Sequence, residues 1–243
     1  MHAIRLCRAL VILSALACPF VPALAAEETH VFISNGELTY FGPITTEANL
    51  KLATLHGADG GKATVLSIRS GGGETTAGME LGAWVRIRKL DVKVMEVCLS
   101  SCANYVFTAG RNKIVSNFAV VGFHGGLGST NFAFDPAFQK VLDAMAPAER
   151  TTYQAQMKQD QARQLAEETA FFNSIGVRPE ITLLGQAAPY IAEYDKDDKV
   201  WGWTYSVTDF AALGVDKITV INGPWAPRLI SGKHTFFPVT VKK

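Results

Sequence analysis

The corner Cys98-Leu99-Ser100-Ser101-Cys102 constrains the fold more than any other stretch of the sequence. An apolar, β-branched run over 91–97 leads into it and predicts a strand, and the small apolar residues 103–109 predict a buried helix after it. Such a bend exposes a hydroxyl above a sheet and leaves the N–H groups of the first helical turn without acceptors. A serine at this corner is therefore a candidate nucleophile for acyl transfer, with oxyanion-binding groups beside it.

A glycine-rich loop follows the preceding strand that the sequence predicts. Residues 63–68 predict a buried strand, Ser70-Gly71-Gly72-Gly73 a loop, and 76–90 a helix with apolar residues at helical spacing. Three successive glycines let the backbone approach a ligand closely and turn an N–H group toward it. Because the phosphate-binding pattern GxxxxGK[ST] is absent, a simple strand-to-helix connection is the alternative interpretation.

His124 ends the apolar run that begins at Phe118, and two glycines follow it. The helix after the corner carries the chain away by about 12 Å, and about 20 Å of extended chain can bring it back. His124 can therefore return to the level of the serine and act as its general base. A structural or merely exposed histidine is the alternative, and it is our interpretation of His30, His56 and His234.

Residues 1–25 have the features of a secretory signal peptide. Two arginines precede an apolar run from Ala9 to Phe20, and Ala23-Leu24-Ala25 forms a small-residue cleavage site. We therefore expect an exported protein whose mature chain starts at Ala26. An uncleaved membrane anchor and a lipid-anchored form cleaved before Cys18 are the alternatives, although the apolar run is shorter than the ~20 residues that span a membrane.

Cys98 and Cys102 are the cysteines that remain after such cleavage, and they flank the serine corner. In an oxidising compartment, two cysteines across so tight a bend can reach the ~4.4–6.8 Å Cα separation of a disulfide. We predict that they pair and fix the corner. Two buried free thiols are the alternative. A metal site is not expected, because the sequence has neither paired CxxC motifs nor HExxH.

Composition limits the class of protein. The 243 residues are 48% hydrophobic and 19% charged, as expected for a globular chain with a sizeable core. Lys and Arg number 23 against 22 Asp and Glu, and no long basic run occurs, so nucleic acid is not expected as a partner. No pattern calls for a cofactor.

The remaining patterns complete an α/β chain that we interpret as one domain over residues 26–243. Further expected elements are a hairpin over 31–42, a helix over 46–55 capped by Thr46, a helical arm or lid over about 131–186, a strand over 200–207, a short helix capped by Thr208, a last strand over 215–221 and a peripheral tail after Pro224.

Four segments, taken together, resemble the proteolytic subunit of the Clp protease. Residues 70–79 are similar to that family's glycine loop and helix start, and Ser101-Cys102-Ala103 with Ala109-Gly110 is similar to its nucleophile and the end of the next helix. His124 and the segment 206–216 follow at similar spacing, so the resemblance covers about residues 42–220. With the signal peptide, the Cys-x-Ser-x-Cys corner resembles exported Clp-like proteins of Gram-negative bacteria, which implies a periplasmic location.

The resemblance implies a ClpP/crotonase-like spiral of ββα units, a serine peptidase mechanism and a homo-oligomer. Counting back from Gly110 without gaps gives Ser101 as the nucleophile, whereas the Cys-x-Ser-x-Cys pattern gives Ser100. His124 would be the general base. The N–H groups of Gly72 and Cys102 would bind the oxyanion, and Gly73 lies in the same substrate-binding loop.

The acid of a catalytic triad has no obvious counterpart. The family's aspartate position is taken by Gly202, and Asp195, Asp197 or Asp198 could reach His124 only through a shifted loop. A Ser–His pair without an acid is the other possibility, at a cost of up to about 10⁴ in turnover.

We therefore expect an exported serine hydrolase, a Clp-like peptidase, that acts on a peptide or related acyl substrate through an acyl-enzyme. A crotonase-like acyl-thioester site, which needs the oxyanion N–H groups but no nucleophile, is one alternative. A non-catalytic binding or assembly module on the same scaffold is another. Contact with a membrane is expected only through an uncleaved signal segment.

Overall fold

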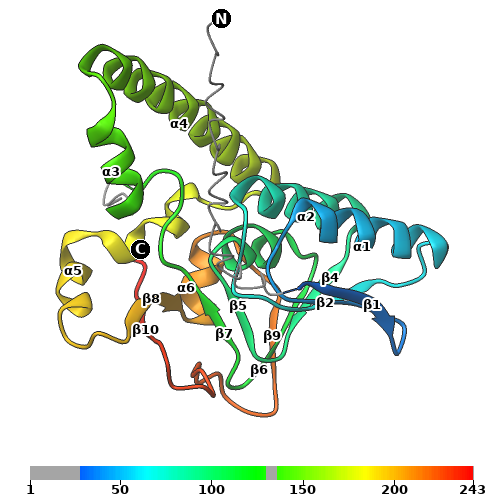
Figure 1. Cartoon of the computed structure of the whole chain (residues 1–243). Helices are drawn as coiled ribbons and strands as arrows, with labels where there is room; N and C mark the ends of the chain where they lie inside the picture. Colours follow the sequence, from blue (N-terminus) through cyan, green and yellow to red (C-terminus); the bar gives the residue numbers. More distant parts are fainter. Residues whose placement is uncertain (1–27, 130–135, 243) are drawn as a thin grey trace, which may run out of the picture.

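The computed structural model describes residues 28–129 and 136–242, and it is a mixed α/β structure built on a six-stranded sheet (Figure 1). The strand order is β1-β2-β3-β4-β6-β9, with β1 antiparallel to β2 and the other pairs parallel. These strands are β1 (His30–Ser34), β2 (Glu37–Phe41), β3 (Val65–Arg69), β4 (Asp91–Val94), β6 (Lys113–Ser116) and β9 (Ile218–Ile221). The expected α/β class is confirmed, and the signal segment 1–25 lies outside the described residues.

β1 and β2 form the hairpin that the sequence predicts. Asn35 and Gly36 have φ angles of 51° and 74°, and the two-residue turn that needs positive φ at both positions matches the twist of a hairpin. Leu38 and Tyr40, on alternate positions of β2, are fully buried. Turn and alternation are both local signals, which is why the sequence specifies this element.

Two further pairs of strands continue from the end of β3. They are β5 (Val97–Leu99) with β7 (Val120–Gly122), and β8 (Val200–Tyr205) with β10 (Thr235–Val239), each pair parallel. Single bridges between Ser70 and Cys98 and between Phe123 and Trp203 link β3, β5, β7 and β8 in that order. The segments that follow β3, β5 and β7 are thereby brought together, and these are the glycine loop, the serine corner and His124.

The single strand predicted over residues 91–97 is wrong, because the chain changes sheets at Met95 and Glu96. β4 pairs with β3 and β6, whereas β5 pairs with β7. The carbonyl of Met95 leaves the ladder and accepts a hydrogen bond from the Ser116 hydroxyl at 2.7 Å. The residue pattern does not predict β6, whose first residue is the buried Lys113.

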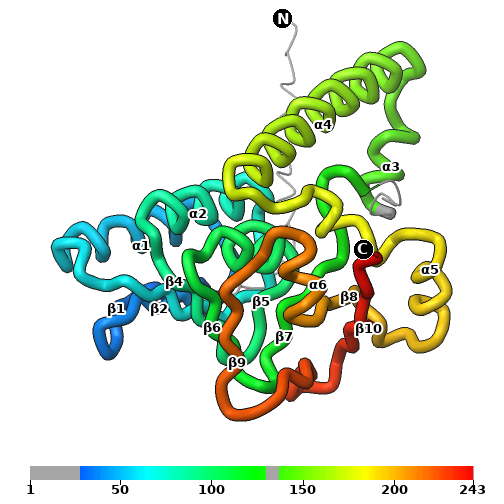
Figure 2. Tube along the Cα trace, turned by 180° about the vertical axis from the view of Figure 1, so that it is seen from behind, coloured from blue at the N-terminus to red at the C-terminus, as the bar shows by residue number. Residues whose placement is uncertain are grey.

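Helices α1 (Thr46–Ala58) and α2 (Thr75–Arg88) lie side by side along the six-stranded sheet (Figures 1 and 2). The cap of α1 is Thr45, not Thr46, because the Thr45 hydroxyl accepts the Ala48 N–H at 3.2 Å. α1 also continues to Ala58 instead of ending at residue 55, since Gly57 is tolerated inside the exposed end of the helix.

Helices α3 (Pro136–Ala144) and α4 (Pro147–Ile175) extend away from the sheet where the sequence predicts a helical arm (Figure 2). Residues 131–135 of that predicted arm lie outside the described residues. The C-terminal end of α4 is anchored in the core by Phe171, Phe172 and Ile175. No helix within the described residues has the length and apolar character needed to cross a membrane.

The tail after Pro224 is not peripheral, contrary to expectation. β10 pairs with β8, Val239 is 1% exposed, and the Trp225 indole donates to the Ala119 carbonyl at 2.7 Å. The short helix after β8 is capped by Ser206 instead of Thr208, since the Ser206 hydroxyl accepts the Asp209 N–H. The remaining elements are the 3-10 turns η2 (Pro179–Thr182) and η3 (Leu184–Gln186) and the helices α5 (Ala188–Tyr194) and α6 (Val207–Ala212).

Candidate active site

Ser100 occupies a constrained backbone position directly after β5. Its φ angle is 55°, in the left-handed region that residues with a side chain rarely adopt. The Ser100 N–H donates to the Gly122 carbonyl at 2.9 Å, and the Ser100 carbonyl accepts the Asn104 N–H at 2.8 Å. A conformation of this kind costs about 1–3 kcal/mol and persists only where the surroundings fix it. The corner therefore holds the Ser100 side chain in one place.

A disulfide between Cys98 and Cys102 closes the corner, as the sequence predicts. The two Cα atoms are 5.2 Å apart, and both side chains are fully buried. Because Ser100 lies midway between the bridged cysteines, the disulfide limits the movement of the serine backbone.

The helix after the corner, η1 (Cys102–Phe107), is a π-helix. π-helical turns are rare and lie frequently at functional sites. They hold more residues per turn than an α-helix, so one extra residue fits between the corner and Gly110. An ungapped count back from Gly110 then stops one residue short of the corner. This difference gives a physical reason why ungapped counting selects Ser101 when the bend itself is at Ser100.

The two serines of the corner have different partners. Ser100 Oγ lies 2.7 Å from His124 Nε2, across the line where β5 and β7 end. Ser101 is 4% exposed, and its hydroxyl donates to the Gly73 carbonyl at 2.9 Å. The structure therefore brings Ser100, and not Ser101, to the histidine.

The imidazole of His124 packs against the indole of Trp201, with ring centroids 4.2 Å apart and planes inclined by 31°. Desolvation of the ring lowers the pKa of His124 below its ordinary value of 6.5, because burial disfavours the charged imidazolium. The neutral imidazole consequently predominates at pH 7. Its Nε2 can then accept a proton from Ser100, provided that Nδ1 carries the ring proton.

No carboxylate contacts His124 within the part of the chain that the structure describes. Asp197 instead accepts the Lys199 N–H at 2.9 Å, and neither Asp195 nor Asp198 bonds to the histidine. The shifted loop that the sequence left open is therefore not found. Position 202 also has no room for an acidic side chain, because a Cβ there would lie 1.9 Å from the Phe123 carbonyl oxygen.

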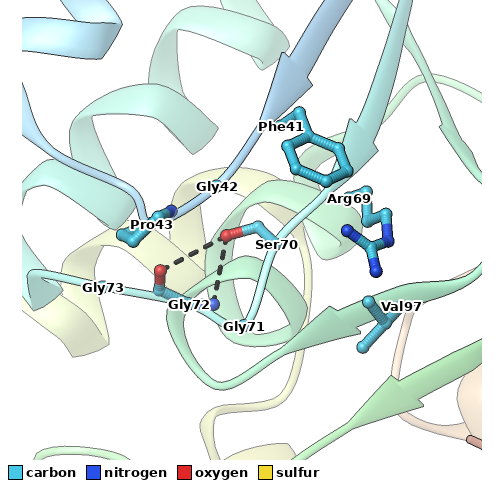
Figure 3. Close-up of a pocket in the computed structure, with 9 residues that line it drawn as sticks. All are labelled: Phe41, Gly42, Pro43, Arg69, Ser70, Gly71, Gly72, Gly73 and Val97. Atoms are coloured by element: carbon cyan, nitrogen blue, oxygen red, sulfur yellow. Dashed lines mark hydrogen bonds between the residues drawn. The ribbon is translucent and has the colours of Figure 1, made fainter. Parts of the chain in front are cut away.

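The N–H of Gly72, expected to bind the oxyanion, already has a partner. It donates to the Ser70 hydroxyl at 3.1 Å, as Figure 3 shows. Gly72 contributes instead by its lack of a side chain, since a Cβ there would lie 2.6 Å from the Cβ of Ser100. Its φ of 101° also favours glycine.

Three other N–H groups near the corner have no acceptor among the described residues: those of Gly73, Ser101 and Cys102. Ser101 and Cys102 begin the helix, where N–H groups lack intrahelical partners and the helix end is positive. Of the two expected oxyanion groups, the N–H of Cys102 thus remains available, and so does the N–H of Gly73 in the expected substrate-binding loop. The Ser101 N–H joins them, because it directly follows the serine that meets His124.

Comparison of the sequence with models of protein families finds no match, and no curated protein matches it either. Function is therefore inferred from the geometry of the site. The described residues contain no group of three or more His, Cys, Asp and Glu side chains that could hold a metal ion.

Ser100 and His124 both line a pocket of about 330 Å³. Its other walls are Thr75, Ser101, Asn104, Tyr105, Gly125, Gly126, Leu127, Ser129 and Gln186, none of which carries a charge at neutral pH. A second cavity, of about 430 Å³, runs along the glycine loop and includes Phe41, Arg69 and Val97 (Figure 3). The glycine loop thus faces a cavity large enough for an extended ligand.

Two residues that support the site carry no signal in the sequence: Trp201 and Glu168. Glu168 of α4 is 3% exposed and accepts hydrogen bonds from the Tyr105 hydroxyl at 2.6 Å and the Leu127 N–H at 3.1 Å. Burial raises the pKa of its carboxyl group. Glu168 joins the arm to the loop after His124, but in the sequence it is one glutamate among several in a polar helix.

Proposed function

We propose that the protein is an exported serine hydrolase, a Clp-like peptidase, with Ser100 as nucleophile and His124 as general base. The observation that carries this proposal is the 2.7 Å contact between Ser100 Oγ and His124 Nε2. A constrained corner, a disulfide and a neutral imidazole support it. Ser101 takes a structural part, because its hydroxyl is committed to the Gly73 carbonyl.

In the proposed reaction, Ser100 Oγ attacks the carbonyl carbon of the substrate while its proton passes to His124 Nε2. The carbonyl oxygen becomes an oxyanion, which the N–H groups of Ser101 and Gly73 stabilise. The imidazolium returns the proton to the leaving amine or alcohol, and the acyl–Ser100 ester remains. Water, deprotonated by His124, then attacks the ester and releases the acid and free Ser100.

The substrate that we infer is a peptide or a related acyl compound. Gly73 is exposed, and its N–H has no partner among the described residues, so an extended chain could pair with the glycine loop. A spiral of ββα units, a homo-oligomer and a periplasmic location belong to the same proposal. The disulfide supports an oxidising compartment.

One observation favours a second candidate, a non-catalytic binding module on the same scaffold: His124 has no acid to orient it within the described residues. A crotonase-like acyl-thioester site would keep its activity after the Ser100 hydroxyl is removed. These candidates make different predictions for a reagent that reacts only with activated serines.

A fluorophosphonate probe should label the folded, oxidised protein once per chain, at Ser100, and intact-protein mass spectrometry would count the adducts. The reason is that only the neutral imidazole beside Ser100 can take up the hydroxyl proton as the phosphorus–oxygen bond forms. The matched control is protein unfolded in guanidinium chloride. Absence of an adduct on the folded protein would favour the non-catalytic module.

The rate of this labelling should fall in acid with one limb whose midpoint is below pH 6.5. The folded pKa of His124 is lowered, so the neutral base predominates at pH 7 and is lost as the pH drops through that pKa. Below the midpoint the rate should fall about tenfold per pH unit, because only the neutral fraction reacts. A pseudo-first-order rate profile between pH 4.5 and 8 checks this, and a midpoint above 7 would contradict it.

A further inference from the structure

The environment of His124 contains an orienting group of an unusual kind. The ring has one side-chain hydrogen bond, to Ser100, and its Nδ1 has no acceptor among the described residues. The imidazole packs against the Trp201 ring, at 4.2 Å between centroids. The histidine backbone is held separately, because Gln186 Nε2 donates to the His124 carbonyl at 3.1 Å.

Trp201 is itself held in place from the far strand of its sheet. Its ring packs edge-on against Phe236 of β10, with centroids 5.7 Å apart, and lies tilted against the His234 ring, with centroids 5.9 Å apart. Phe236 in turn leaves no room for a side chain at Gly122, where a Cβ would lie 2.4 Å from the Phe236 ring. The indole therefore contacts one ring from the segment after β7 and another from β10, and these contacts limit its movement.

The strand pairing that places Trp201 here also excludes a carboxylate from the neighbouring position. Phe123 and Trp203 exchange two backbone hydrogen bonds of 2.8 Å, which press Gly202 against the Phe123 carbonyl. One residue earlier, Trp201 then falls beside His124. Desolvation is the cause of the lowered pKa of His124, and a second imidazole, that of His234, also packs against the indole, with ring centroids 5.9 Å apart.

We propose that Trp201 is the positioning residue of the Ser100–His124 pair, and that its indole face does the orienting work that a carboxylate does in a catalytic triad. Stacking fixes the plane of the imidazole so that Nε2 points at Ser100. The negative face of the indole also favours the imidazolium that forms when Ser100 gives up its proton. This inference rests on the proposed hydrolase function.

Three substitutions of Trp201 distinguish the effect of its aromatic face from the effect of its volume. Trp201→Phe keeps an aromatic face, Trp201→Leu keeps an apolar filler, and Trp201→Ala removes both. We expect fluorophosphonate labelling to fall about 100-fold in the leucine and alanine variants, as for a misplaced catalytic group, and to stay within about fivefold in the phenylalanine variant. Thermal unfolding of each variant controls for folding. Equal rates in Trp201→Leu and the parent would overturn the proposal.

Indole fluorescence gives a second readout that does not need a reactive serine. An imidazolium in contact with an indole quenches its emission, so emission should drop as the pH falls through the pKa of His124. Because the His234 ring also packs against the indole, the readout is taken in a His234→Gln background, where the drop should vanish in Trp201→Phe and in His124→Gln. It should persist in Trp225→Phe, because Trp225 stacks on Phe210 instead.

The two readouts distinguish the possible failures. If the parent protein is not labelled but the quenching is present, the proposed hydrolase function is rejected, and the contact between Trp201 and His124 is still supported. Labelling of the parent with no quenching step, or with quenching retained in Trp201→Phe, would sink the positioning role and leave the hydrolase.

Discussion

Replacing Ser100 with alanine should abolish fluorophosphonate labelling and lower hydrolysis of an activated ester by about 10³-fold or more, whereas Ser101→Ala should keep both within about tenfold. The first change removes the hydroxyl that contacts His124. The second removes a hydrogen bond to the Gly73 carbonyl, worth about 1 kcal/mol, but leaves the backbone N–H of residue 101 in place. Adduct mass and ester turnover, measured on the same preparations, check both expectations.

The pair of variants is its own control, since both remove one hydroxyl from the same disulfide-bridged corner. If Ser101→Ala lost its reactivity while Ser100→Ala kept it, Ser101 would be the nucleophile, as the ungapped count gives. The contact between Ser100 and His124 would then play no part in the reaction. Full ester turnover in Ser100→Ala would instead support an acyl-thioester type of site, in which the N–H groups alone act on the carbonyl.

The parts of the fold that the sequence predicts are those with local causes. The hairpin follows from Asn35-Gly36 and the alternation after it, and α2 follows from apolar residues at helical spacing. The division of residues 91–97 between two sheets has no local cause. It depends on which strands β4 and β5 meet, and those partners lie far along the chain. β6 is not predicted because it begins with a lysine that is buried, and the Lys113 ammonium there donates to the backbone carbonyl of Asp216 at 3.2 Å.

The candidate site divides in the same way. The corner, the disulfide and the return of His124 to the serine are predictable, because each follows from residue types at a strand end. The choice between Ser100 and Ser101 is left open by the sequence, because the Cys-x-Ser-x-Cys pattern gives Ser100, whereas the ungapped count, which does not allow for the π-helix, gives Ser101. The hydrogen bond from the Gly72 N–H to the Ser70 hydroxyl is also not predictable, since it depends on a side-chain rotamer.

Gly202 should be the least tolerant position beside the site, and its substitution is the largest stability effect that we expect. In Gly202→Ala a single methyl group would overlap the Phe123 carbonyl oxygen, 1.9 Å from the ideal Cβ, so the strands at the Phe123–Trp203 bridge must separate. We expect a loss of about 3 kcal/mol or more, and a fall in Tm of about 6–12 °C. Scanning calorimetry measures this. Gly57→Ala is the matched control, because nothing lies within 4 Å of its Cβ.

Gly202→Asp tests whether the same lack of space also prevents a carboxylate at this position from assisting the reaction. If the site lacked only an orienting acid, an aspartate at this position would speed up fluorophosphonate labelling. Because the backbone leaves no space for a side chain there, we expect instead a protein that is less stable than Gly202→Ala and labels more slowly than the parent. The His124 Cβ lies only 3.2 Å from the same ideal Cβ, so the substitution displaces the histidine that it would need to help. A stable Gly202→Asp protein with faster labelling would show that the strands can part at low cost and that a carboxylate orients His124 better than Trp201 does.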